Sequence, residues 1–140
     1  MDAYDMNNVF AGILRGEIPV HKVYEDETTL AFMEITPRSD GHVLVIPKAQ
    51  ARNILDVAPE VLADLMVKAQ RIAIAAKAAM KADGLSIQQF SETAGGQTVF
   101  HLHVHIMPRY KGIALRSSAE VMPEHSLLAD QAEAIRRALA

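Results

Sequence analysis

Three histidines at positions 101, 103 and 105 are the residues of this sequence best suited to chemistry. The run reads His101-Leu102-His103-Val104-His105, so an apolar residue separates each pair of histidines. Side chains of a β-strand alternate between its two faces, and a strand here would turn all three imidazoles to one side. Imidazole serves as acid, base and metal ligand near neutral pH. The run therefore predicts a site in which several imidazoles face one pocket.

The residues alone leave three interpretations of this run. Strand histidines are most often surface or satisfied core residues, although packing hardly explains three of them on one face. A shared metal ion needs convergent ligands, yet His101 and His105 lie about 13 Å apart on a straight strand, against metal–nitrogen bonds of about 2.0–2.1 Å. His42 is a further candidate ligand, but no carboxylate or thiol motif accompanies it. The third interpretation is covalent catalysis, in which a neutral imidazole attacks phosphorus.

A nucleophilic histidine depends on its neighbours. Its distal nitrogen must be protonated and held, so that the attacking nitrogen is free. Donors must face the phosphate oxygens, and a group must protonate the leaving atom. The loop Gly95-Gly96-Gln97-Thr98 precedes the histidines and offers flexible backbone and two polar side chains. A Gly-Gly pair on its own is more often only a turn.

Hydrophobic periodicity predicts the elements that position these residues. We expect strands over 20–24, 28–35, 42–46, 85–90 and 99–107, and helices over 9–14, 59–83 and 124–139. One long helix between groups of strands favours an α+β domain. Its expected form is an antiparallel five-stranded sheet with one long helix and short terminal helices.

Composition narrows the classes of protein that this chain can represent. A length of 140 residues fits a single domain, 1–140, and a net charge of −3 argues against a nucleic-acid partner. The absence of cysteine excludes disulfides and thiolate metal sites and favours a reducing, cytoplasmic location. Residues 1–8 carry no apolar run of a signal peptide, and the most apolar stretch, 72–80, is too short to span a membrane. We therefore expect no membrane partner.

The sequence resembles the histidine triad (HIT) superfamily, whose motif is His-φ-His-φ-His-φ-φ with φ apolar. Residues 101–107 match this motif, and residues 15–19, 41–48 and 95–100 match further family segments in the same order. The resemblance covers about residues 7–111, the expected core, and leaves a C-terminal tail with a helix, 112–140, outside it. It implies the HIT-like fold and a homodimer with a continuous sheet.

The resemblance also implies an activity that needs no cofactor. Similar proteins cleave nucleotides, such as nucleoside phosphoramidates and dinucleoside polyphosphates, at the α-phosphorus and typically release AMP. His103 would attack and form a nucleotidyl-histidine, which water or another acceptor resolves. The His101 carbonyl would hold the His103 ring, His42 would hydrogen-bond the His101 side chain, and His105 would contact the α-phosphate.

Substrate contacts follow from the resemblance by position. Gln97 and Thr98, with Gly96 beside them, would meet the phosphate or the leaving group. Glu34 occupies a ribose position that is usually Asp or Asn, and a surface carboxylate is the alternative. A purine base would lie among four apolar residues that could also be ordinary core: Val9, Phe10, Ile13 and Ile35.

Two departures from the family pattern bear on function. Ser91 follows Phe90 where many relatives have Asn, which leaves recognition of the leaving group open. Asn8 and Ala11 stand where some bacterial relatives have zinc-binding cysteines, so we expect no metal. Besides the enzyme, a nucleotide-binding regulatory module with slow turnover and a metal-dependent hydrolase remain as alternatives.

Overall fold

The computed structural model describes residues 1–117 and 122–140. Its strands within these ranges are β1 (Lys22–Glu25), β2 (Thr29–Met33), β3 (Val43–Pro47), β4 (Gly84–Gln88) and β5 (Val104–Arg109). The helices are α1 (Val9–Leu14), α2 (Pro59–Ala79) and α3 (His125–Leu139), with a short 3-10 turn, η1 (Thr93–Gly95). Four residues of the predicted tail, 118–121, lie outside the described residues.

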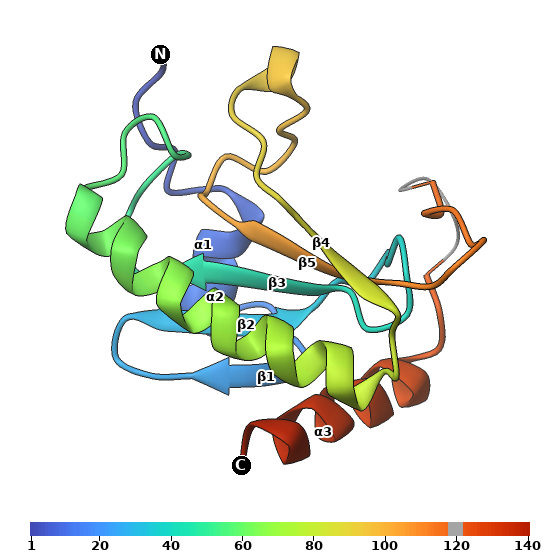
Figure 1. The fold of residues 1–140 in the computed structure, drawn as a ribbon. Helices are drawn as coiled ribbons and strands as arrows, with labels where there is room; N and C mark the ends of the chain where they lie inside the picture. Colours follow the sequence, from blue (N-terminus) through green and yellow to red (C-terminus); the bar gives the residue numbers. More distant parts are fainter. Residues whose placement is uncertain (118–121) are drawn as a thin grey trace.

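The strands form one antiparallel sheet in the order β1-β2-β3-β5-β4 (Figure 1). This confirms the predicted α+β class and five-stranded antiparallel sheet. Strands β3 and β5 are neighbours in the middle of the sheet. β3 begins directly after His42 and β5 contains His105, and Val43 pairs with Ile106 while Leu44 pairs with His105. This register decides which side chains meet at the site.

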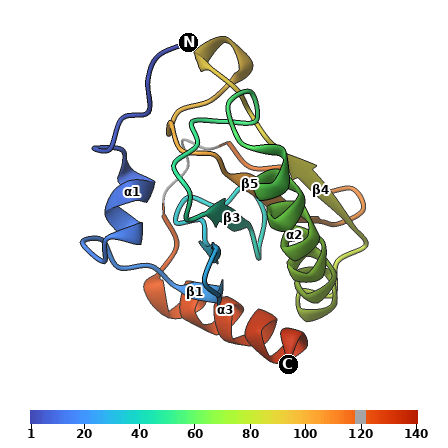
Figure 2. The ribbon, with the colours of Figure 1, turned by 90° about the vertical axis from the view of Figure 1, so that its left-hand side faces the viewer.

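Alternation along the strands gives the sheet two buried faces. Val43 and Val45 of β3, with Val104 and Ile106 of β5, belong to the larger core together with α2 and α3. Leu44 points to the opposite face and packs in a smaller cluster with α1. Figure 2 shows α1 on one side of the sheet and α2 on the other. The α1 face is the one that carries the candidate site.

Helix α2 shows the signals that its sequence predicts. Pro59 is preorganised for a helix start, while Glu60 near the start and Lys77 near the end complement the helix dipole. The helix ends at Ala79 rather than at the predicted Asp83, because Lys81 adopts a left-handed φ of 52°. Most of its periodic apolar residues are buried, including Leu65, Ala69, Ile72, Ala73 and Ala76, whereas Met66, also expected on this face, is exposed.

The C-terminal helix α3 packs against α2 and β1. Its buried residues Leu128, Ala132 and Ile135 join the larger core of the sheet. The part of the predicted tail that forms α3 is therefore integral to the packed structure. None of the helices in the described ranges is long and apolar enough to cross a membrane.

The strand predicted over 99–107 is displaced in the structure. β5 begins at Val104 and continues through Pro108 to Arg109, which faces Gly84 of β4. Residues before Val104 leave the sheet, and the backbone N–H of Leu102 donates to the Ala51 carbonyl at 2.8 Å. Only one triad histidine, at position 105, therefore lies in a strand. The ends of the other strands differ from the predicted ends by no more than two residues.

Candidate active site

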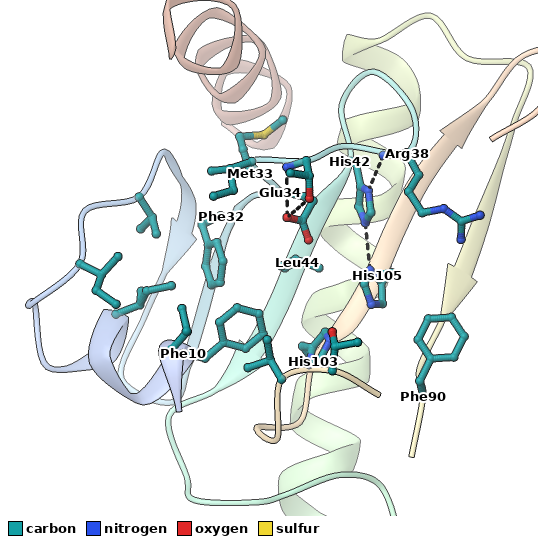
Figure 3. A pocket seen from close by; sticks show the side chains of 18 of the residues that line it. Phe10, Phe32, Met33, Glu34, Arg38, His42, Leu44, Phe90, His103 and His105 are labelled. Atoms are coloured by element: carbon teal, nitrogen blue, oxygen red, sulfur yellow. Dashed lines mark hydrogen bonds between the residues drawn. The ribbon is translucent and has the colours of Figure 1, made fainter. Parts of the chain in front are cut away.

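A cavity of about 640 Å³ opens on the α1 face of the sheet (Figure 3). Its walls come from α1, β2, β3, the loop before β3, the loop after β4 and the histidine segment. The cavity brings together most of the predicted site residues, namely His42, His103, His105, Gly96, Thr98, Glu34, Val9, Phe10, Ile13 and Ile35. His101, Gln97 and Ser91 do not line it.

The His103 ring is held by a hydrogen bond within its own segment. Its Nδ1 lies 2.7 Å from the carbonyl oxygen of His101, and a carbonyl can only accept. Nδ1 therefore carries the proton, and the lone pair of the neutral ring is on Nε2. The ring is buried and makes edge contacts with Phe10 and His105, each with centroids 4.9 Å apart. A ring fixed in this tautomer is poised as a nucleophile.

His42 and His105 form a second hydrogen-bonded unit with defined tautomers. The backbone N–H of Arg38 donates to His42 Nδ1 at 3.1 Å, so this nitrogen is an acceptor. The proton of the neutral His42 ring is then on Nε2, which lies 3.0 Å from His105 Nδ1 (Figure 3). His105 Nδ1 therefore accepts the hydrogen bond from His42 Nε2–H, and the proton of the neutral His105 ring is on Nε2. His105 thus offers an N–H donor beside His103.

The predicted hydrogen bond between His42 and the His101 side chain is wrong. His101 Nε2 donates to the Pro47 carbonyl at 2.8 Å, and its Nδ1 accepts from the Tyr4 hydroxyl at 2.5 Å. The sheet register is the cause, because pairing Leu44 with His105 places His42 beside His105 and far along the chain from His101. Tyr4 was not predicted, and its position in the N-terminal segment carries no pattern that would indicate this contact.

Gln97 does not face the cavity, contrary to prediction. Its side-chain nitrogen donates to the carbonyls of Arg52 and Val99 at 2.7 and 3.0 Å. Its side-chain oxygen accepts from the Glu92 backbone N–H at 2.8 Å and from the Asn53 side chain at 3.1 Å. All four hydrogen bonds of a buried amide are made within the protein. Gln97 therefore fixes the loop rather than binding phosphate.

Of the other residues in this loop, some make hydrogen bonds within the protein and others line the cavity. Ser91 exchanges hydrogen bonds with the Gln89 side chain at 3.0–3.2 Å and does not line the cavity, and a contact from Ser91 to a leaving group stays a prediction. Gly96 and Thr98 line the cavity with Phe90. The φ of Gly96 is +100°, a conformation that favours glycine, so its backbone can approach the cavity closely.

Glu34 turns its carboxylate toward the cavity. Its Oε1 accepts from the backbone N–H and the hydroxyl of Thr36 at 3.2 and 3.3 Å. Burial raises the pKa of this carboxyl above its ordinary value. A half-buried carboxylate with a second oxygen available suits a ligand that donates hydroxyl hydrogens.

Glu34, His42 and His105 also resemble a metal-ligand set, because one donor atom of each lies within 4.8 Å of the others. The fold thus supplies the carboxylate that the sequence pattern lacked. The hydrogen bonds nevertheless occupy the lone pairs: His42 Nδ1 accepts from Arg38, and His105 Nδ1 accepts from His42. Two ring tautomers would have to change before either imidazole could bind a cation here. The absence of a metal requirement stays a prediction.

Burial lowers the pKa of all four histidines of the site. The pKa of His42 falls to about 3, through burial and then through repulsion by Arg38 and, once protonated at low pH, by His105. That of His105 falls to about 4, through burial and then through His103 and Arg38. The rings are therefore neutral at pH 7, as the two tautomer assignments require.

We expect the free energy of unfolding to decrease as the pH falls below about 6.5, where histidines of the unfolded chain begin to bind protons. In the folded protein, His42 and His105 resist protonation until about pH 3 and 4. Between these limits the unfolded state binds more protons, so each of the two can contribute a slope of up to about 1.4 kcal/mol per pH unit. Urea unfolding between pH 7 and pH 4 measures this slope.

The matched variant is His42→Gln, which keeps an acceptor and a donor but does not titrate. It should make the slope shallower by up to about 1.4 kcal/mol per pH unit. A slope identical to that of the wild type would show that His42 is not a buried titrating group.

Comparisons with known proteins agree with this geometry. The model of the HIT domain matches residues 15–112. A crystal structure of a HIT-like protein involved in cell-cycle regulation from Bartonella henselae is 46% identical, with a TM-score of 0.93, and the match covers 98% of this chain and 99% of that one. A zinc-bound histidine triad family protein from Mycobacterium smegmatis is 37% identical, with a TM-score of 0.85 and coverage of 96% and 94%.

A third relative carries the name of an activity. Adenylylsulfatase HINT3 of Arabidopsis thaliana is 37% identical over 123 residues, which are 88% of this chain and 62% of the relative. The family match spans most of the chain and includes every histidine of the cavity. This chain therefore belongs to the HIT family.

Proposed function

We propose that this protein is a nucleotide hydrolase or transferase that cleaves its substrate at the α-phosphorus and forms a nucleotidyl-histidine at His103. The observation that carries the proposal is the bond from His103 Nδ1 to the His101 carbonyl. It leaves the Nε2 lone pair for attack, in a cavity that combines an apolar end with polar groups. A purine nucleoside monophosphate unit has the same division of polarity.

The apolar end suits the base. Val9, Phe10, Ile13 and Ile35 line it, and Phe32 extends it through an edge contact with Phe10. Val9 and Ile35 remain about half exposed in the protein alone, so a bound base would cover them. The neighbouring Glu34 carboxylate is the natural acceptor for ribose hydroxyls.

The polar end suits the phosphate. In the first step, His103 Nε2 forms a bond to the α-phosphorus, the bond to the leaving group breaks, and the electron pair departs with that group. The Nε2–H of His105 donates to a phosphate oxygen as negative charge develops. In the second step, water attacks the same phosphorus and loses a proton to solvent, while the bond from phosphorus to His103 Nε2 breaks and its electron pair returns to that nitrogen. A nucleoside monophosphate is then released. An acceptor other than water would instead leave with the nucleotidyl group attached to it.

The test is the release of AMP from adenosine 5′-phosphoramidate, adenosine 5′-phosphosulfate and diadenosine tetraphosphate. We expect turnover that persists in the presence of a chelator. Binding of these compounds without AMP release would favour the regulatory module. Loss of activity with the chelator, together with stoichiometric metal by elemental analysis, would favour a metal-dependent hydrolase.

We also propose that two copies form a homodimer through β4 and α2, in the cytoplasmic location that the composition favours. β4 ends the sheet, and two exposed apolar residues of α2, Met66 and Ile74, form a groove with Ile87 of β4. Two-fold pairing of β4 with a second copy would continue the sheet and cover these side chains. Sedimentation equilibrium should give twice 15.3 kDa, and a mass of one chain would contradict the dimer.

A further inference from the structure

Among the described residues that line the cavity, Arg38 is the one lysine or arginine. It lies in the loop between β2 and β3, four residues before His42, and its side chain is half-buried. Figure 3 shows this side chain at the His105 and Phe90 end of the cavity, away from the apolar end at Phe10. The positive charge of Arg38 therefore lies beyond His105, the residue that would contact the α-phosphate.

The chain segment after β5 holds Arg38 in place. The backbone N–H of Arg116 donates to the Arg38 carbonyl at 2.7 Å, and Arg38 Nε donates back to the Arg116 carbonyl at 3.0 Å. The Arg116 side chain in turn donates to the Pro37 carbonyl and to Asp40. These bonds fix the loop and the direction of the guanidinium.

The bond to Arg116 uses Nε, so among the described residues both terminal amino groups of Arg38 remain available to a ligand. Within residues 1–117 and 122–140, no carboxylate oxygen lies within 4.0 Å of the guanidinium. The positive charge of Arg38 acts on the site, because it disfavours protonation of His42 and His105 and so helps to lower both of their pKa values. A preorganised guanidinium of this kind suits a tetrahedral oxyanion, which accepts two parallel hydrogen bonds.

We propose that Arg38 determines specificity for the leaving group and favours substrates that release an anion, such as sulfate or a phosphate chain, over substrates that release an amine. This inference rests on the proposed function. When His103 Nε2 attacks, the bond from phosphorus to the leaving oxygen breaks and its electron pair stays on that oxygen. The guanidinium then stabilises the departing anion, which leaves without a proton.

An amine leaving group makes the opposite demand. Its nitrogen keeps the electron pair when the bond to phosphorus breaks and must take up a proton to leave. A nearby guanidinium has no proton to give at neutral pH and does not attract an ammonium group. Arg38 should therefore aid sulfate and phosphate release while contributing little to amine release.

The experiment compares kcat/KM for three substrates that share the AMP unit: adenosine 5′-phosphosulfate, diadenosine tetraphosphate and adenosine 5′-phosphoramidate. Arg38→Gln should lower the values for the first two by about 10–100-fold, the loss expected for a charge-assisted hydrogen bond, and the third by less than about threefold. Arg38→Lys should retain part of the preference. Arg137→Gln, which removes an exposed charge from α3, should change none of the three.

The phosphoramidate also reports on the integrity of the site, because Arg38 holds His42 through its backbone and the substitution keeps that N–H. Equal losses on all three substrates, or unchanged ratios among them, would overturn the inference while leaving the proposed function in place. Failure of the wild-type protein to release AMP from any of the three would instead overturn the proposed function, and the role of Arg38 with it.

Discussion

His103→Ala is expected to lower AMP release by a factor on the order of 10⁶, the size of effect seen when a covalent nucleophile is removed. The neutral Nε2 of His103 is the group that forms the bond to phosphorus, and neither neighbouring imidazole can replace it. His101 uses both ring nitrogens in hydrogen bonds to Pro47 and Tyr4, and His105 presents a protonated Nε2. Single-turnover and steady-state assays with adenosine 5′-phosphoramidate measure the loss.

Binding should survive this substitution, because the apolar end of the cavity and Glu34 are untouched. AMP affinity by calorimetry and the far-ultraviolet circular dichroism spectrum are the controls. A rate within about tenfold of the wild type, in a variant that still binds AMP, would end the assignment of His103 as nucleophile.

His105→Ala should slow turnover by about 10²–10³-fold, the cost of removing one preorganised donor to a developing oxyanion. The argument depends on the tautomer chain from the Arg38 N–H through His42, which places the His105 proton on Nε2. Because a glutamine side chain also ends in an N–H donor, His105→Gln should lose less activity than the alanine variant. The comparison is made on kcat/KM with each substrate at pH 7.

A rate unchanged in His105→Ala would remove this role. The variant also leaves His42 Nε2 without its acceptor, so urea unfolding must accompany the kinetics. A stable His105→Gln variant that is as slow as the alanine variant would show that the imidazole acts by some means other than donating a hydrogen bond.

Local patterns in the sequence predicted the frame of the site. In the strand predicted over 42–46, alternation puts His42 and Leu44 on one face, and the structure places both at the cavity. The periodic stripe of α2 and the Pro59 start indicated the helix that covers the opposite face. These features depend on neighbours within a few residues, which is the range that a sequence pattern can report.

The contacts that the sequence did not predict depend on register and loops. Whether His42 meets His101 or His105 depends on how β3 pairs with β5, which is a long-range register that local patterns do not report. Gln97 reads as a phosphate donor in a glycine-rich loop, but residues 52 and 53, far away in the chain, occupy its amide. No sequence pattern indicated a role for Arg38, because an arginine in a polar loop is common and its importance depends on the cavity beside it.

The covalent step can be observed directly. Mixing the protein with adenosine 5′-phosphoramidate, quenching within one turnover and analysing the intact chain and its peptides by mass spectrometry should show one adenylyl group on His103. His103→Ala, treated in the same way, should show none. Rapid AMP release with no adduct on the wild-type chain at any quench time, or an adduct on a residue other than His103, would contradict nucleophilic attack by this histidine.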